Sequence, residues 1–94
     1  MDLGNTIKRI RTNKEIKQKD LAKACKMTQA YLSKIENNQK EPTISSLRMI
    51  AKQLDVPLPI LLFQSLTDDD VDPQKKEAFQ VILPSIQRMI ESFF

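Results

Sequence analysis

A helix that stops and restarts is the feature of this sequence that most constrains its fold. Residues 21–36 read LAKACKMTQAYLSKIE: apolar residues at helical spacing, a break that holds neither glycine nor proline, and more apolar residues at helical spacing. Thr28 stands at the restart, where its hydroxyl can accept a hydrogen bond from an otherwise unpaired backbone amide. One continuous helix would pack these apolar residues more simply. The break therefore indicates that the second helix lies at a sharp angle to the first.

The rest of the chain is also helical in pattern, and no segment shows the sustained alternation of a strand. Helices are predicted over residues 3–14, 18–25, 29–37, 44–54, 59–63 and 73–93. The clearest periodic stripe lies in the fourth of these and consists of Leu47, Ile50, Ala51 and Leu54. Asp72 and Pro73 suit the cap and the first position of the last helix. The expected fold class is all-α.

Charge divides the chain near residue 63. Residues 1–63 hold 12 Lys and Arg against 6 Asp and Glu, a formal charge of +6, whereas residues 64–94 hold 3 against 6, a formal charge of −3. A basic domain favours a polyanionic partner. We expect a basic helical domain at residues 1–63, an acidic linker at residues 64–72, and an amphipathic C-terminal helix at residues 73–94.

Several classes of function have little support in the composition. The 94 residues contain no histidine, one glycine and one cysteine, Cys25, which excludes the usual proton shuttles, phosphate-binding loops and thiolate metal sites. We therefore expect no enzyme, no metal and no cofactor. The longest apolar run, residues 58–63, is too short to span a membrane. The single cysteine and the absence of a leader favour the cytoplasm.

Two short helices joined by a tight turn form the helix-turn-helix unit, whose second helix enters the DNA major groove. In residues 29–37, small and hydrogen-bonding side chains share the face opposite Leu32 and Ile35. They are Gln29, Ala30, Ser33, Lys34 and Asn37. An ordinary solvent-exposed face would show the same pattern, so periodicity alone leaves both interpretations open.

Residues 18–62 read QKDLAKACKMTQAYLSKIENNQKEPTISSLRMIAKQLDVPLPILL. Three patterns follow one another in this segment: Gln then Leu-Ala, Thr then Tyr-Leu-Ser-x-Ile-Glu, and Leu-x-x-Ile-Ala. Their order resembles that of the Cro/phage-repressor type of helix-turn-helix protein, the XRE family. The resemblance implies a five-helix lambda-repressor-like DNA-binding domain, here with an additional C-terminal helix. It also implies a bacterial or phage-encoded regulator of double-stranded DNA, most simply a repressor.

The resemblance further implies roles for single residues. Base contacts are expected from Gln29, which can bond bidentately to adenine, and from Ala30, Ser33 and Lys34. Phosphate contacts are expected from residues at helix starts, in the following loop and in the first helix, namely Gln18, Thr28, Tyr31, Asn37, Lys40 and Arg11. A second interpretation of Arg11 stays open, in which it forms a partly buried ion pair with Glu36.

The chain departs from the family at three turns, where glycine is favoured and this sequence has Glu15, Lys26 and Asn38. Such turns tend to need a positive φ. Asparagine tolerates that conformation, whereas glutamate and lysine adopt it at a cost of about 1 kcal/mol each.

The last helix carries an apolar stripe of its own: Phe79, Ile82, Leu83, Ile86, Met89, Ile90 and Phe93. The stripe either folds back on the fourth and fifth helices or pairs with a second copy. We favour a homodimer, which would place two DNA-reading helices on a palindromic operator. A different class of function also fits, an antitoxin-like module that neutralises a protein partner through this helix and autoregulates by binding DNA.

Overall fold

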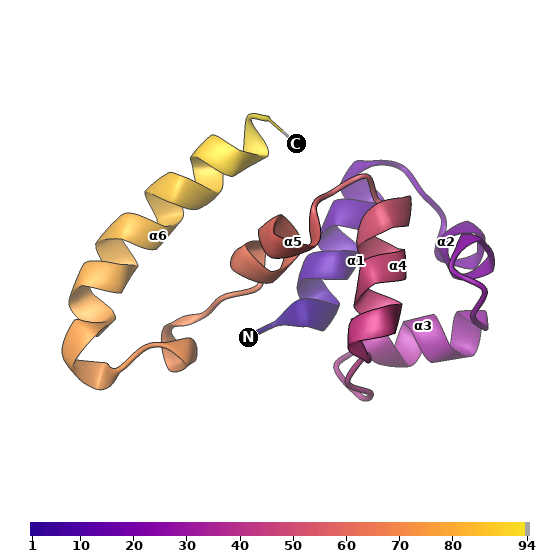
Figure 1. The fold of residues 1–94 in the computed structure, drawn as a ribbon, viewed down its shortest axis with the longest axis horizontal. Helices are drawn as coiled ribbons and strands as arrows, with labels where there is room; N and C mark the ends of the chain where they lie inside the picture. The colour runs from indigo at the N-terminus through magenta and orange to yellow at the C-terminus, as the bar shows by residue number, and fades with distance from the viewer. Residues whose placement is uncertain (94) are drawn as a thin grey trace.

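The computed structural model describes residues 1–93, and all of their regular structure is helical (Figure 1). The helices are α1 Leu3–Asn13, α2 Gln18–Ala24, α3 Gln29–Glu36, α4 Ile44–Gln53, α5 Leu58–Gln64 and α6 Lys76–Glu91, with the 3₁₀ turns η1 Asp68–Asp70 and η2 Pro73–Lys75. The all-α prediction is confirmed, and each of the first five helices lies within one residue of its predicted ends. None of the described helices is long and apolar enough to cross a bilayer.

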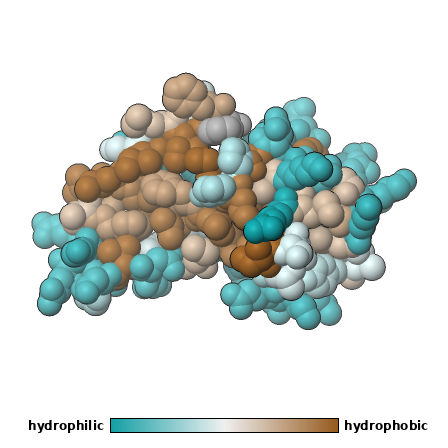
Figure 2. Space-filling view, viewed as in Figure 1, coloured by the Kyte–Doolittle hydropathy of each residue, from teal (hydrophilic) through white to brown (hydrophobic). Residues whose placement is uncertain are grey.

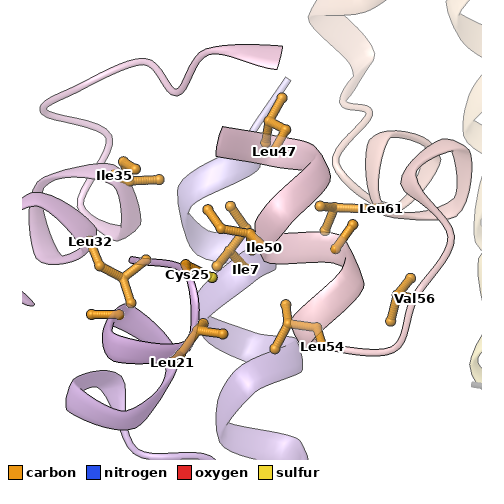
Figure 3. Packing of buried hydrophobic residues seen from close by; sticks show 12 residues of the cluster. Ile7, Leu21, Cys25, Leu32, Ile35, Leu47, Ile50, Leu54, Val56 and Leu61 are labelled. Carbon is orange, nitrogen blue, oxygen red and sulfur yellow. The ribbon is translucent and has the colours of Figure 1, made fainter. Parts of the chain in front are cut away.

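Helices α1 to α5 enclose one hydrophobic core. Helix α1 packs against α3 and α5, α2 against α3 and α4, and α4 against α5; in Figure 1, α2 and α3 lie to the right of α1 and α5 lies to its left. The side chains that meet between them come from all five helices, as Figure 3 shows for Ile7, Leu21, Leu32, Ile50 and Leu61. The stripe predicted in the fourth helix is buried throughout, since Leu47, Ile50, Ala51 and Leu54 are each at most 3% exposed. These helices therefore form one small domain around a shared core.

The first four helices end in the same kind of turn. In each, the residue after the C-cap has a positive φ, at Glu15 (59°), Lys26 (57°), Asn38 (58°) and Asp55 (57°). Two backbone hydrogen bonds close each turn as in a Schellman motif. After α2, the Lys26 N–H donates to the Lys23 carbonyl (3.1 Å) and the Met27 N–H to the Ala22 carbonyl (3.0 Å). The positive φ predicted at three of these positions is confirmed, and Asp55 is a fourth that the sequence analysis missed.

Asn38 explains why one of these turns has no glycine. Its Oδ1 accepts a hydrogen bond from the Gly4 N–H (3.1 Å), and its Nδ2 donates to Asp2 Oδ1 (2.9 Å). The start of α1 crosses the end of α3 here so closely that a Cβ on Gly4 would lie 2.8 Å from the Glu36 carbonyl oxygen. The chain thus needs its single glycine at the helix crossing, and the asparagine side chain joins the two helices.

The acidic segment before α6 is partly ordered by local hydrogen bonds. The Thr67 N–H donates to Asp70 Oδ2 (2.8 Å), and this bond lowers the pKa of the Asp70 carboxyl below its usual value. Asp72 Oδ1 accepts from the Gln74 N–H (2.9 Å) and so caps η2. The sixth helix was predicted from residue 73, but residues 73–75 form this 3₁₀ turn and α6 proper begins at Lys76.

Only one edge of the apolar stripe on α6 is covered by its own chain. The helix lies beside α5, with Leu83 buried and Phe79 and Ile90 half-buried. The other edge faces solvent and consists of Ile82, Ile86, Met89 and Phe93. Figure 2 shows the resulting apolar area over α6 and the neighbouring α5, beside a more hydrophilic surface over α2 to α4. Leu83 therefore belongs to packing within the chain.

Candidate nucleic-acid interface

The turn between α2 and α3 sets the direction of α3. The Schellman turn at Lys26 ends α2, and two residues later Thr28 Oγ1 accepts from the Tyr31 N–H (3.1 Å) and caps α3. Leu32 and Ile35 then anchor the inner side of α3 in the core, at 0% and 1% exposure. Local hydrogen bonds fix the break and apolar burial fixes the rotation, so the opposite face of α3 points outward.

The structure brings the predicted base-contacting side chains together on that outward face. Gln29, Ala30 and Lys34 are exposed, and Ser33 is half-buried between them. Asn37 follows one turn later, and its Nδ2 donates to Ser33 Oγ (3.4 Å). The face offers amide, hydroxyl and ammonium groups with no large apolar side chain, which suits the donors and acceptors on base edges.

A polar chain runs from the domain interior to this face. Arg11 Nε donates to Glu36 Oε2 (2.7 Å) and Arg11 Nη2 to Glu36 Oε1 (3.0 Å), a bidentate pair between α1 and the end of α3. Gln18 Nε2 donates to the same Glu36 Oε1 (3.0 Å). Gln29 Nε2 in turn donates to Gln18 Oε1 (3.3 Å). Every link of this chain restrains the next, so the first residue of α3 is held by the buried ion pair.

Burial decides between the two interpretations of Arg11. The residue is 8% exposed, its partner Glu36 is 4% exposed, and Arg11 Nη1 also donates to the Ile16 carbonyl (2.8 Å). All its bonds point inward, as the ion-pair interpretation requires. Arg11 therefore acts as the partner of Glu36, and burial leaves its remaining N–H groups little exposure for a phosphate.

The other phosphate candidates lie around the rim of the outward face of α3. Thr28 and Asn37 are exposed at its two ends, and Lys40 is exposed in the loop that follows. Tyr31 is half-buried, with Lys40 Nζ 6.0 Å from its ring centroid. Gln18, at the start of α2, is also half-buried. A DNA backbone that crosses this rim would meet hydrogen-bond donors on both sides of α3.

The sequence analysis missed one exposed residue beside this rim. Ile44 begins α4 directly after the loop of residues 37–43 and is 59% exposed. The sequence could have indicated this exposure, because Ile44 lies off the buried apolar stripe of its own helix and directly follows Thr43, the N-cap of α4. An aliphatic side chain there can contact deoxyribose or a thymine methyl group.

The described residues offer neither a metal-binding cluster nor a reactive thiol. No three His, Cys, Asp or Glu side chains among them are grouped to hold a metal ion. Cys25 is buried in the core, and burial raises the pKa of its thiol, which makes it a poor nucleophile.

Comparison with known proteins gives relatives of one kind. The family model described as "Helix-turn-helix" matches residues 7–61, more than half of the chain. An ImmF control region 10 kDa protein of Bacillus phage phi105 is 41% identical over 59 residues, which cover 63% of this chain and 66% of that protein. The HTH-type transcriptional regulator SutR of Escherichia coli is 34% identical over 76 residues, covering 79% of this chain and 43% of SutR. The chain thus spans less than two thirds of either relative's own length.

Solved structures show the same arrangement of helices. One crystal structure of the clp gene regulator ClgR from C. glutamicum has a TM-score of 0.63 at 26% identity and covers 65% of this chain and 79% of that one. A second ClgR structure, from Corynebacterium glutamicum, has a TM-score of 0.67 and covers 96% of this chain and 87% of that one. At 22% identity the second match shows the fold alone, and it extends over the C-terminal helix.

Proposed function

Because the chain belongs to the helix-turn-helix family of DNA-binding transcriptional regulators, we propose that it is a repressor that binds a palindromic operator as a homodimer. The observation that supports this proposal best is the polar face of α3. Buried apolar side chains on the other side of the helix turn this face outward, and the hydrogen-bonded chain Arg11–Glu36–Gln18–Gln29 holds its first residue in place. Pre-positioned side chains lose less conformational freedom on binding than mobile ones. The site of action would be the cytoplasm of a bacterium, where operator DNA lies.

Base reading is assigned to Gln29, Ala30, Ser33 and Lys34. Gln29 would bond to adenine N6 and N7, Lys34 to guanine O6 or N7, and Ala30 would meet a thymine methyl. Phosphate contacts are assigned to Gln18, Thr28, Tyr31, Asn37 and Lys40, and Ile44 would touch the sugar backbone beside them. Apart from that of Ile44, these roles come from the resemblance to the family, and the exposed or half-buried position of each side chain on α2, α3, the following loop and α4 is compatible with them.

The exposed edge of α6 supports the homodimer. Its residues Ile82, Ile86, Met89 and Phe93 follow one another at alternating spacings of four and three residues, the repeat that packs one helix against another. Ile82, Met89 and Phe93 are 55%, 63% and 81% exposed. Leu83 and Ile90 on the adjoining edge keep α6 on its own chain. A second α6 could therefore cover the exposed edge without detaching the first from α5.

The test is selection of binding sites from randomised duplex DNA, followed by sedimentation with the selected duplex. We expect an inverted repeat bound by two chains. An enriched site without two-fold symmetry, bound by one chain, would contradict the proposed operator and stoichiometry. No enrichment over random duplexes would contradict base reading itself.

The antitoxin-like alternative rests on the same exposed edge, together with the formal charge of −3 on residues 64–94. A basic protein partner would complement that charge and cover the apolar side chains. Purification from a native host separates the two proposals. A second polypeptide in stoichiometric amount, which displaces the α6 pairing, would favour the alternative.

A further inference from the structure

A hollow of about 290 Å³ lies between the C-terminal half of α6 and helices α1 and α5. Its apolar lining consists of Ile10, Val56, Ile60 and Ile90. Arg9 and Lys14 bring two cationic groups to its edge, against one carboxylate, that of Glu91. An apolar floor with a few converging polar groups is the usual composition of a small-molecule site, and here the polar edge has an excess of positive charge.

A second hollow of about 330 Å³ adjoins the first and has a mainly polar lining. Arg9, Gln64 and Glu91 line both hollows and so form the partition between them. Two polar contacts cross the partition from the domain to α6: Arg9 Nη1 to Glu91 Oε1 (3.3 Å) and Gln64 Nε2 to the Gln87 carbonyl (3.4 Å). Arg9 is therefore within reach of ligand groups in either hollow.

The Arg9–Glu91 pair is weak enough to be replaced. Its side chains are 38% and 53% exposed, and it makes one long contact instead of a bidentate one. Exposed pairs of this kind contribute little to stability, because water and salt compete for both groups. A free carboxylate could bond Arg9 bidentately, with the nearby Lys14 adding favourable charge.

We propose that the 290 Å³ hollow binds a small aliphatic carboxylate as an effector. The alkyl chain lies on Ile10, Ile60 and Ile90, and the carboxylate replaces Glu91 on Arg9. Binding thus replaces the Arg9–Glu91 contact, which holds α6 to the domain, with a contact between Arg9 and the ligand. Because α6 carries the exposed apolar edge, its displacement would alter operator affinity, a consequence that rests on the proposed homodimer. The binding itself does not depend on that proposal.

The test is a titration of the full-length chain with octanoate, followed by ¹H–¹³C methyl NMR at constant ionic strength and below the micelle concentration. We expect saturable shifts in the methyl groups of Ile10, Ile60 and Ile90. 1-Octanol, which has the chain without the charge, should bind more weakly, and acetate should not shift these methyl groups. Equal affinity for octanol and octanoate, or shifts spread over all methyl groups, would overturn the proposal.

Two variants with opposite expected effects separate ligand binding from simple loosening of α6. Arg9→Gln should weaken octanoate binding about tenfold. Glu91→Gln removes the competing carboxylate and should tighten binding by up to about fivefold. Arg48→Gln, an exposed arginine on α4 outside both hollows, is the matched control and should change nothing. If Arg9→Gln and Glu91→Gln weaken binding alike, the carboxylate site is refuted. If octanoate binds as expected but operator affinity does not change, only the link to the proposed dimer fails.

Discussion

Gln29 Nε2 donates a hydrogen bond to Gln18 Oε1 at 3.3 Å, which ties the first residue of α3 to the first residue of α2. Gln18 is itself bonded to the buried carboxylate of Glu36. The two glutamines thus share one network, although one is assigned to a base and the other to a phosphate.

The first prediction concerns these two glutamines. Gln29→Ala should cost about 1–3 kcal/mol on the cognate duplex and little on random DNA, since it removes a base reader. Gln18→Ala should weaken both duplexes and also relax preference at the base pair that Gln29 reads, because Gln29 loses its hydrogen-bond partner. Paired titrations on cognate and scrambled duplexes at fixed salt measure both effects. Equal losses on the two duplexes for Gln29→Ala would refute its role as a base reader.

The second prediction concerns the buried ion pair. Glu36→Ala should destabilise the domain by about 3–5 kcal/mol, because it leaves the Arg11 guanidinium buried without its carboxylate. The exposed Glu41, in the loop after α3, provides the control, and Glu41→Ala should change stability by less than about 0.5 kcal/mol. Urea denaturation followed by circular dichroism gives both values. Similar small losses for the two variants would mean that the pair contributes nothing to the fold.

The third prediction uses the turns with positive φ. Glu15→Gly and Lys26→Gly should each stabilise the domain by about 0.5–1 kcal/mol, because relief of left-handed strain exceeds the entropy cost of glycine. Asn38→Gly should instead destabilise it by about 1 kcal/mol, through loss of the bonds to Gly4 and Asp2. Thermal unfolding of the three variants distinguishes the signs. Stabilisation by Asn38→Gly would show that its side-chain bonds do not matter.

The fourth prediction tests the exposed edge of α6. Ile86→Lys places a charge in that edge and should convert dimer to folded monomer with weaker operator binding. Val81→Lys is the control, because Val81 is 71% exposed and lies outside the apolar stripe. Deletion of residues 72–94 should also leave a folded monomer. Sedimentation velocity measures the oligomeric state. An unchanged dimer after Ile86→Lys would move the interface elsewhere, with α5 as the next place to test.

The fifth prediction concerns salt. A dimer that neutralises about eight to ten phosphates should show a slope of log K on log salt of about −7 to −9. Titrations of the selected duplex at several salt concentrations measure the slope. A slope near zero would mean that the basic surface of residues 1–63 only keeps the chain in solution.

The sequence by itself determined the first five helices to within one residue and the positive φ at Glu15, Lys26 and Asn38, but not the turn at Asp55 or the start of α6. Thr28 caps α3 as predicted, by accepting a bond from the Tyr31 amide, and Thr43 caps α4 in the same way by accepting from the Ser46 amide. The positive φ at Lys26 was also predictable. The physical reason is that these features depend on bonds between residues two to five apart in the chain, which hydrophobic periodicity and capping chemistry already encode.

Only the tertiary structure decided which side chains are free. Arg11 could pair with Glu36 or contact DNA, and the crossing of α1 over the end of α3 buries it in the pair. The apolar stripe of α6 could pack on its own chain or on another, and the packing of α6 on its own chain buries Leu83 while leaving Met89 in solvent. The hollow beside Arg9 lies where the C-terminal half of α6 meets α1 and α5. All three depend on distances between residues far apart in the sequence, which local pattern does not encode and packing of the whole chain sets.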